Sequence, residues 1–378
     1  MGTADKAARQ RARVAMYNDN RLKIGLFGAN CSSGRAVTKV AERWLGSWEE
    51  CLRLGVMADE AGIDFMLPIA RWKGYGGDTD YQGTTLETMT WATGLLAKTR
   101  RITVLGTVHA PLFHPIVAAK QMVTADLIGE GRFGLNLVCG SNEGEFEMFG
   151  VTMKEHDQRY EYAQEWLSTM EQMWMGGDDF DFDGKFIKLK KVRAKPKPYG
   201  GTRPLIMNAA MSPVGQAFAV KNCDALFSSP TAEGKIEEFS DVVTGVKALA
   251  RQHGREIGVY TVAVVCARAT KKEAEDYYQY AVLDNADWTA VDSIIELRLH
   301  RPLSSIEPKE LERIRNNLAA GRGGLPIIGD ADYVAQEFAK LSAAGIAGIG
   351  LSLLNYEREL PFFCDEVLPR LKRMGLRA

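Results

Sequence analysis

Long apolar runs are missing from this 378-residue sequence, and no stretch approaches the length that a membrane-spanning helix requires. The first twenty residues are polar and charged, and they lack the apolar core of a signal peptide. We therefore expect a cytoplasmic protein that does not enter a membrane.

An excess of charge of one sign is also missing. The 47 lysine and arginine residues and the 48 aspartate and glutamate residues nearly cancel. Neither a nucleic acid nor an anionic membrane surface is therefore expected as the main partner. The basic run at 185–197 is a local exception, and we interpret it as part of a solvated hairpin, predicted over 182–190, that turns at Asp183-Gly184.

Cysteines at metal-binding or redox spacing are missing as well. The six cysteines are scattered along the chain, and no C-x-x-C pair occurs. This distribution indicates neither a metal site nor a disulfide framework. We interpret the cysteines as small buried hydrophobic residues in a reducing compartment.

Several short catalytic motifs do not occur in the sequence. There is no H-E-x-x-H, no G-x-S-x-G and no G-x-x-x-x-G-K-[ST] motif, so metalloprotease, serine hydrolase and P-loop functions have no local support. No G-x-G-x-x-G follows the first predicted strand either. A self-contained dinucleotide-binding domain is therefore not expected.

What the sequence does contain is a regular alternation of strand-like and helix-like stretches. One helix, for example, is predicted where Trp48, Leu52 and Val56 recur at four-residue spacing before Gly62. Strands are predicted at 21–28, 63–67, 102–108, 133–139, 204–209, 225–228, 259–267 and 346–353. Eight strands that alternate with helices favour an α/β fold of the (β/α)8 TIM-barrel type.

The segment 271–325 departs from this alternation. It is charged, helical in character and longer than a normal connection. We interpret it as a helical insertion at the C-terminal face of a single domain that covers residues 1–378. The walls of a ligand pocket are expected from this segment and from the loops 29–46 and 70–83.

Asn136 stands at the centre of an otherwise apolar strand in the stretch 131–150. A buried polar group left unpaired costs about 1–3 kcal/mol, so Asn136 either bonds to neighbouring backbone or meets a ligand. In a barrel of this type, ligand-contacting residues lie at the carboxyl ends of strands or in the loops just after them. Six polar residues satisfy that placement: Arg71, Thr107, Asn136, Glu145, Arg159 and Ser212.

Two histidines, His109 and His114, follow the strand that ends near Thr107. Either of them could face the pocket as a proton donor, since an imidazole titrates near neutrality. The alternative is that both are ordinary loop residues.

Four stretches of the sequence, in this order, resemble the bacterial luciferase-like flavin-dependent monooxygenases. They are TTLETMTWATGLLAKTRRITVLGTV, HPIVAAKQMVTADLIGEGRFGLNLVCG, EHDQRYEYAQEWL and IGDADYVAQEFAKLSAAGIAGIGLSLLNYERELPFFCDEVLPRLK. Within that superfamily the sequence is most similar to the branch of pyrimidine, dimethylsulfone and dibenzothiophene-sulfone monooxygenases. The resemblance covers nearly the whole chain.

This resemblance implies a two-component enzyme, in which a separate flavin reductase supplies FMN as FMNH2 and the monooxygenase uses it with O2. It implies a small electron-poor heterocycle, a sulfone or a related xenobiotic as substrate, with oxidative C–N or C–S bond cleavage through a flavin peroxide. It also implies a homodimer or homotetramer. Two other functions stay open: a flavin- or deazaflavin-dependent dehydrogenase, and a non-catalytic flavin-binding protein.

The resemblance also assigns roles to residues of the pocket. FMN contacts fall on Ala70, Arg71, Asn136, Glu145, Arg159, Tyr160 and Ser212. Thr107 and Asn136 match a polar pair beside the flavin N5 atom that is implied in holding oxygen there. Oxygen addition at the flavin C4a carbon, as in luciferase, is the open alternative. Two positions depart from the branch, because Ser141 stands where a tryptophan is common and Ala70 where an isoleucine is common.

Overall fold

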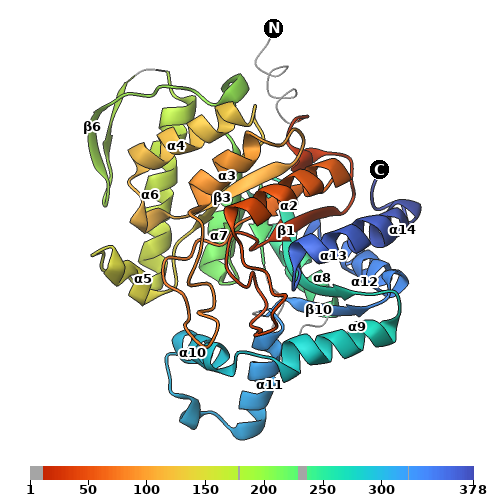
Figure 1. Cartoon of the computed structure of the whole chain (residues 1–378). Helices are drawn as coiled ribbons and strands as arrows, with labels where there is room; N and C mark the ends of the chain where they lie inside the picture. Colours follow the sequence, from red (N-terminus) through yellow and green to blue (C-terminus); the bar gives the residue numbers. More distant parts are fainter. Residues whose placement is uncertain (1–11, 178, 229–235, 322) are drawn as a thin grey trace.

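The computed structural model describes residues 12–177, 179–228, 236–321 and 323–378. At its centre is a closed barrel of eight parallel strands surrounded by helices (Figure 1). In order around the barrel these are β1 (Lys23–Phe27), β2 (Phe65–Leu67), β3 (Thr103–His109), β4 (Phe133–Val138), β7 (Leu205–Ala209), β8 (Ala225–Phe227), β9 (Gly258–Ala267) and β11 (Gly348–Ser352). The ring closes because β9 pairs with both β8 and β11, and β11 pairs with β1. The predicted TIM barrel is therefore confirmed.

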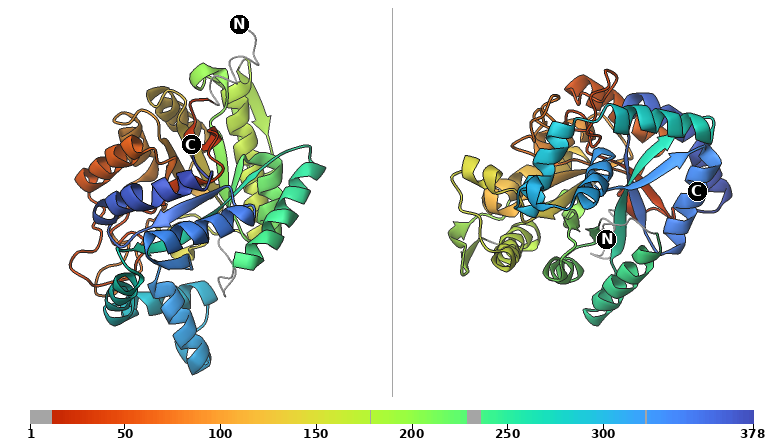
Figure 2. Two further views of the ribbon diagram at one scale, coloured as in Figure 1. Left: turned by 90° about the vertical axis from the view of Figure 1, so that its right-hand side faces the viewer. Right: turned by 90° about the horizontal axis from the view of Figure 1, so that it is seen from below.

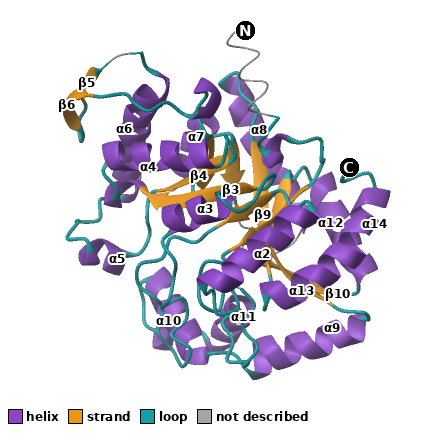
Figure 3. Ribbon diagram, turned by 45° about the horizontal axis from the view of Figure 1, so that its top comes forward, coloured by secondary structure: helices purple, strands orange, loops and turns teal. Residues whose placement is uncertain are grey.

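The helices lie outside this ring, as Figure 3 shows by colour. They are α2 (Trp48–Ala61), α3 (Thr88–Leu96), α4 (Pro115–Ile128), α5 (Glu143–Met148), α6 (His156–Met175), α7 (Pro213–Asn222), α8 (Ile236–Gln252), α9 (Lys271–Tyr278), α10 (Trp288–Leu299), α11 (Pro308–Ala319), α12 (Ala331–Ala343), α13 (Tyr356–Phe362) and α14 (Leu368–Arg373). The helix predicted from Trp48 is α2, which starts with a capping box between Ser47 and Glu50 and stops at Gly62. None of the helices in the described ranges combines the length and the apolar character that crossing a membrane would need.

The interior of the barrel is filled by alternate residues of the strands, because successive side chains of a strand point to opposite faces. This inward-facing cluster includes Phe65, Leu105, Met207, Phe227 and Tyr260. Residues of the opposite faces pack against the surrounding helices in a separate, larger cluster. Along β3 and β4, every second side chain therefore points into the barrel, and the side chains between them point toward the helices.

A third group of buried apolar residues lies at the carboxyl end of the barrel. It joins the loops 29–46 and 70–83 to η4 (Gln279–Asp284), α10 and α11, and we call these five segments together the cap. In Figure 1 the cap occupies the bottom of the molecule, and the right-hand view of Figure 2 looks onto it. The three stretches expected to wall a pocket are therefore in contact with one another.

Within the segment 271–325, α9 contacts β9 and β10 (Leu325–Gly329), whereas α10 and α11 belong to the cap. β10 was not predicted from the sequence, and among the described strands it pairs with β9 alone. It is short and contains Pro326, which argues against a strand in the interior of a sheet but is compatible with one at an edge. The eight strands of the barrel itself are those that were predicted.

The predicted hairpin is present as β5 (Phe180–Asp183) and β6 (Lys188–Val192). These two antiparallel strands form a separate sheet outside the barrel, at the upper left of Figure 1. Glu165 of α6 anchors the turn, because its carboxylate accepts hydrogen bonds from the backbone N–H groups of Lys185, Phe186 and Ile187.

Candidate active site

Thr107, His109 and Asn136 lie at the carboxyl ends of β3 and β4. Thr107 and Asn136 are register partners on these neighbouring strands. Leu105 belongs to the interior cluster, so Thr107 and His109, two and four residues further along β3, point to the same interior face. All three polar residues are buried, with at most 8% of their surface exposed. They meet at the mouth of the barrel, below the cap.

Thr107 and Asn136 are connected by a hydrogen bond. The Asn136 amide nitrogen Nδ2 donates to Thr107 Oγ1 at 3.1 Å, and Thr107 Oγ1 donates to the backbone carbonyl of Pro68 at 2.6 Å. The Thr107 hydroxyl proton is therefore already donated to the Pro68 carbonyl and is not available to a ligand. Asn136 keeps its amide oxygen, which is buried and has no partner in the described structure, and a second N–H on Nδ2. Of the predicted pair, Asn136 is the residue whose polar atoms are available to a ligand.

Arg71 and Glu145 form a buried ion pair that joins the loop after β2 to α5. Glu145 Oε1 lies 2.8 Å from Arg71 Nη1, and it also accepts hydrogen bonds from the backbone N–H groups of Trp72 at 2.8 Å and Lys73 at 3.3 Å. The Arg71 guanidinium stacks over the Tyr75 ring at 4.7 Å. The positive charge of Arg71 is therefore compensated by a carboxylate that is almost fully buried.

The backbone just before Ala70 is held by Asn30, a fully buried residue in the loop after β1. Its amide nitrogen donates to the carbonyls of Ile69 and Leu86, and its amide oxygen accepts from the N–H of Ile69 at 2.8 Å. Asn30 thereby fixes the place from which Ala70 and Arg71 enter the site. Asn30 was not predicted from the sequence, where the only signal is an asparagine directly behind the end of the first strand.

The two histidines after Thr107 have different surroundings. Burial lowers the pKa of His109 to about 4, with Glu145 opposing and Arg71 adding to the effect, so the imidazole is neutral at pH 7. Its Nδ1 atom is buried and has no hydrogen-bond partner among the residues described. His114 instead caps α4, where its side chain accepts from the N–H of Ile116 at 3.3 Å. His114 is thus a helix cap, whereas His109 belongs to the barrel mouth.

Tyr160 and Ser212 form a second group, where α6 approaches the start of α7. Burial raises the pKa of the Tyr160 hydroxyl to about 12, against a smaller opposing effect of a hydrogen bond with the Ser212 side chain. Ser212 also caps α7, since its hydroxyl accepts from the N–H of Gly215 at 3.2 Å. Tyr160 therefore stays protonated and can donate a hydrogen bond beside the amino-terminal end of a helix.

Arg159 is linked to the end of β4. Its Nη1 donates to the carbonyl of Gly140, in the loop after β4, and contacts Met153 Sδ at 3.8 Å. Its Nε atom is buried and has no partner within the described ranges. Arg159 thus brings a guanidinium to the mouth of the barrel with one donor unused.

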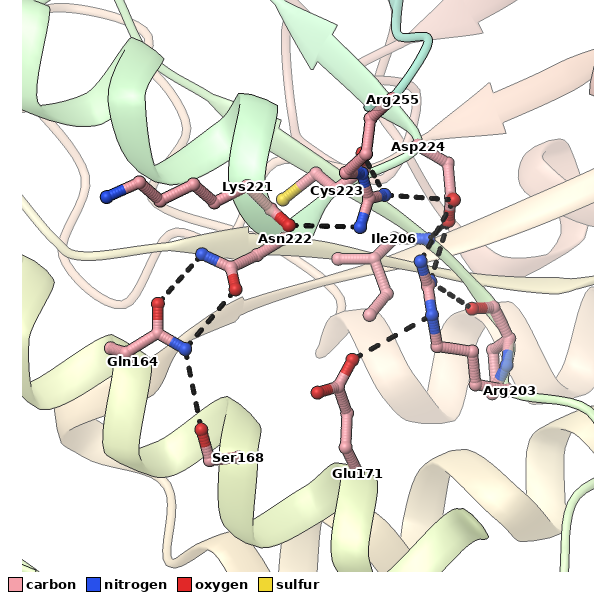
Figure 4. Close-up of polar contacts among 11 residues, drawn as sticks. Gln164, Ser168, Glu171, Arg203, Ile206, Lys221, Asn222, Cys223, Asp224 and Arg255 are labelled. Carbon is pink, nitrogen blue, oxygen red and sulfur yellow. Dashed lines mark hydrogen bonds and ion pairs between the residues drawn. The ribbon is translucent and has the colours of Figure 1, made fainter. Parts of the chain in front are cut away.

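A network of polar contacts fastens α6 to the strands and helix beside it (Figure 4). Gln164 and Asn222 exchange two hydrogen bonds between α6 and α7. Further along α6, Glu171 approaches Arg203 at 3.8 Å, and Arg203 pairs with Asp224 through two nitrogens at 2.7 and 3.0 Å. These contacts hold the axis of α6, and they thereby set where its first turn presents Arg159 and Tyr160 to α7.

The structure brings most of the predicted site residues together in contacts: Arg71 with Glu145, Thr107 with Asn136, and Tyr160 with Ser212. No group of three histidine, cysteine, aspartate or glutamate side chains that could hold a metal occurs in the described part of the chain. The site combines amide, hydroxyl, guanidinium, carboxylate and imidazole groups around the barrel mouth.

The sequence model of the family "Luciferase-like monooxygenase" matches residues 22–348. This chain belongs to that family. This luciferase-like monooxygenase is 28% identical over 363 residues to an FMNH(2)-dependent dimethylsulfone monooxygenase of Pseudomonas fluorescens strain Pf0-1. The match covers 94% of this chain and 96% of the relative. It is 26% identical over 359 residues to the pyrimidine monooxygenase RutA of Agrobacterium fabrum, with 93% and 96% covered.

Among solved structures, DmoA from Hyphomicrobium sulfonivorans is similar to this luciferase-like monooxygenase with a TM-score of 0.84. The similarity covers 95% of this chain and 89% of that chain at 18% sequence identity. A riboflavin lyase, RcaE, also has a TM-score of 0.84, at 21% identity. At these identities the comparison concerns the fold.

Three aromatic side chains form one wall near the ion pair of this luciferase-like monooxygenase. Trp72, from the loop after β2, contacts Phe113 and Phe149 with ring centroids 6.2 and 5.0 Å apart. Phe113 follows β3 and Phe149 follows α5, so three different loops contribute to the wall. Ser141, which stands where a tryptophan was expected from the resemblance, is exposed.

Proposed function

We propose that this protein is a two-component monooxygenase that uses O2 and FMNH2 from a separate flavin reductase. Its substrate is a small electron-poor heterocycle, a sulfone or a related xenobiotic, in which a C–N or C–S bond is cleaved. The observation that carries the proposal is the Thr107–Asn136 pair at the barrel mouth, in which the Asn136 amide oxygen has no partner among the described residues. Relatives named for FMNH2-dependent and pyrimidine monooxygenation, which match nearly the whole chain, support it.

One end of the site fits the phosphate of FMN. Ser212 caps α7, whose amino-terminal N–H groups favour an anion, and the Tyr160 hydroxyl lies beside it. Arg159 Nε has no partner among the described residues and would add a charge-assisted hydrogen bond. We propose that these three residues hold the phosphate.

The other end fits the flavin ring. Asn136 Oδ1 and Arg71 Nε are both buried without partners in the described residues, and a ring with N–H and carbonyl groups would satisfy them. Glu145 keeps Arg71 in place, and Ala70 offers a small side chain that leaves room for a planar group. We propose that these four residues line the ring.

When bound, reduced FMN supplies the two electrons that let one atom of O2 enter the substrate while the other leaves as water. The protein's own part is positional and electrostatic. Pro68 holds Thr107, and Thr107 holds Asn136, so the second N–H of the amide has a fixed direction. A fixed donor stabilises negative charge that develops on oxygen without reorganisation during the reaction. Thr107 and Asn136 are both buried, so little water reaches this charge.

The proposal is tested by mixing the purified protein with photoreduced FMN, oxygenated buffer and a panel that includes uracil, dimethyl sulfone and dibenzothiophene sulfone. We expect substrate-dependent product that carries one atom of 18O from labelled O2. No product from any member, together with no binding of FMNH2, would show that the proposed class is wrong.

Absorbance of the purified protein tests the alternative function. A two-component monooxygenase binds oxidised FMN weakly, so we expect a nearly colourless preparation. Stoichiometric retention of a flavin or deazaflavin through purification would instead favour a dehydrogenase. Tight FMN binding without oxygen consumption would favour a non-catalytic flavin-binding protein.

We also propose a homodimer or homotetramer that packs through the early helices. In this region α4 exposes Val117, Leu127 and Ile128, apolar side chains that a partner subunit would cover. Light scattering coupled to size-exclusion chromatography measures the assembly directly, and a monomer at micromolar concentration would contradict this part of the proposal.

A further inference from the structure

His109 is a buried side chain for which the proposed reaction has no use. It is the last residue of β3 and lies on the same face as Thr107, one side-chain step closer to the cap. Only 8% of its surface is exposed. Nδ1 is buried without a partner, and no described residue forms a hydrogen bond with either ring nitrogen.

The neighbouring charged groups form no hydrogen bond with the His109 imidazole in the described structure. Arg71 and Glu145 are the charged residues whose fields act on His109, and they bind each other. Glu145 Oε1 already accepts from Arg71 and from two backbone N–H groups. A buried polar group without a partner costs about 1–3 kcal/mol, so an apolar residue of similar size would give a more stable protein at this position.

We infer that His109 is a substrate-binding residue whose neutral imidazole forms a hydrogen bond with an uncharged polar group, such as a carbonyl, an amide N–H or a sulfone oxygen. The inference rests on the proposed function, and it narrows the substrate class to molecules whose group next to His109 carries no negative charge. A neutral imidazole has no charge to offer an anion, and the positive charge of Arg71 is taken by Glu145. Burial, which keeps the pKa of His109 near 4, supports this assignment.

The surroundings of the ion pair agree with an uncharged ring or sulfone. Trp72, Phe113 and Phe149 supply an apolar wall from three loops. Such a site combines aromatic surface with a few polar groups that orient the ligand, which is the usual composition of small-molecule pockets. His109 and Asn136 are polar groups from β3 and β4, and each keeps a ring or amide atom without a partner among the described residues.

The test uses the full-length protein with FMN bound and two matched pairs of probes: uracil against orotate, and dimethyl sulfone against methanesulfonate. NMR follows the ring C–H resonances of His109, which are identified by their loss in His109→Leu. We expect uracil or dimethyl sulfone to shift these resonances and the anionic partner of that probe to have no such effect. The resonances of His156, an exposed residue beside Asp157, serve as the internal control.

Variants at position 109 separate binding from structure. His109→Leu should weaken binding of the effective probe by about tenfold, the size of one or two neutral hydrogen bonds, while FMN affinity stays within about twofold. His109→Asn, which keeps a polar group near Nδ1, should recover part of the loss. Because leucine removes an unsatisfied polar group, His109→Leu should unfold at the same temperature as the wild type or higher.

The inference is wrong if no uncharged probe shifts the His109 resonances, if His109→Leu binds the probe as tightly as the wild type, or if His109→Leu is clearly less stable. These readouts do not require turnover. If His109 senses an uncharged probe but no oxygen is consumed, the proposed function fails alone. If substrate is oxidised equally well by His109→Leu, the inference about His109 fails alone.

Discussion

At the scale of single residues, two threonines of β3 show how position decides the role of a side chain. Thr103 and Thr107 lie on the same face of the strand, four residues apart, and both are buried. Thr107 stands in a chain of hydrogen bonds from Asn136 to Pro68, whereas the Thr103 hydroxyl has no partner in the described ranges. The same residue type is therefore hydrogen-bonded to Asn136 at one position and lacks such a bond at the other.

We predict that Thr107→Val and Asn136→Ala each slow the oxygen-dependent step by roughly 10²–10³-fold, the usual effect of losing one donor to a developing oxyanion. Thr107→Val acts by releasing the Asn136 amide, so its effect on FMN affinity should be far smaller than its effect on rate. Single-turnover stopped-flow measurements with FMNH2 and O2 provide the rates.

Thr103→Val is the matched control, because it makes the same change on the same strand face and should leave the rate unchanged. In the double variant of Thr107 and Asn136 the two losses should not multiply, since both residues act through one amide. Near-normal turnover in Thr107→Val, or an equal loss in Thr103→Val, would contradict the proposed role of the pair.

A second residue-scale prediction concerns Asp126 of α4. Its carboxylate is fully buried, Oδ2 accepts from the N–H of Tyr199 at 2.8 Å, and Oδ1 has no partner among the described groups. Burial raises the pKa of Asp126 to about 7. The folded protein then binds this proton more tightly than the unfolded chain, so Asp126 favours folding below about pH 4 and loses this contribution as the pH rises to about 7.

Asp126→Asn keeps an oxygen for the Tyr199 N–H and removes the titration. The free energy of unfolding of this variant should therefore vary less between pH 4 and 7 than that of the wild type. At pH 8 it should exceed the wild-type value by a few kcal/mol, because each unit between the unfolded and folded pKa values of Asp126 is worth about 1.4 kcal/mol. Urea unfolding at a series of pH values measures this. Asp241→Asn, at an exposed position of α8, should keep the wild-type pH dependence.

At the scale of elements, the barrel depends on glycines that face large rings. A Cβ on Gly25 of β1 would clash with the ring of Phe65, and a Cβ on Gly348 of β11 would lie 2.5 Å from the ring of Tyr260. Both rings belong to the interior cluster. The short strands β1 and β11 thus make room for the aromatic side chains of β2 and β9.

We predict that Gly25→Ala lowers the free energy of unfolding by about 1–3 kcal/mol, as overpacking of a core does. Gly245→Ala is the control, because Gly245 lies in α8 with no atom within 4 Å of an added Cβ. There the same change should stabilise the protein by up to about 1 kcal/mol, through higher helix propensity. Denaturant midpoints of the two variants should shift in opposite directions, and a wild-type midpoint for Gly25→Ala would refute the packing argument.

At the scale of the whole molecule, the cap connects distant parts of the chain to the site. Asp287, which begins α10, accepts two hydrogen bonds from Thr79, at 2.8 Å from the backbone N–H and 2.7 Å from the hydroxyl. The backbone of Val37 bonds to both Asp287 and Ala319. The loop that carries Arg71 is therefore held at its far end by the segment 271–325.

We predict that Asp287→Ser loosens this loop, since serine still caps α10 but cannot reach Thr79 as the carboxylate does. Amide hydrogen exchange within 77–81 should rise by tenfold or more, because hydrogen bonds to a charged group contribute about 1.5–3 kcal/mol each. Substrate affinity should fall more than FMN affinity. The comparison variant is Asp292→Ser, which breaks the pair with Arg315 inside the cap; equal exchange in both variants would rule out a specific role for Asp287.

The sequence by itself determined the eight barrel strands, the hairpin and the resemblance from which the site residues were named. Strand and helix periodicities are local, and the polar residues that follow strand ends can be read from short stretches such as 131–150. The parallel order then brings those ends to one face. This is why Arg71, Thr107, Asn136 and Ser212 could be selected before any contact was known.

Only the tertiary structure decided which polar atoms remain available. The Thr107 proton goes to Pro68, 39 residues away, and Arg71 is neutralised by Glu145, 74 residues away. The neutral state of His109 and the anchoring of the 70–83 loop by Asp287 also depend on groups that meet only after folding. Hydrogen-bond direction and burial are properties of the assembled neighbourhood, so no local pattern in the sequence could reveal them.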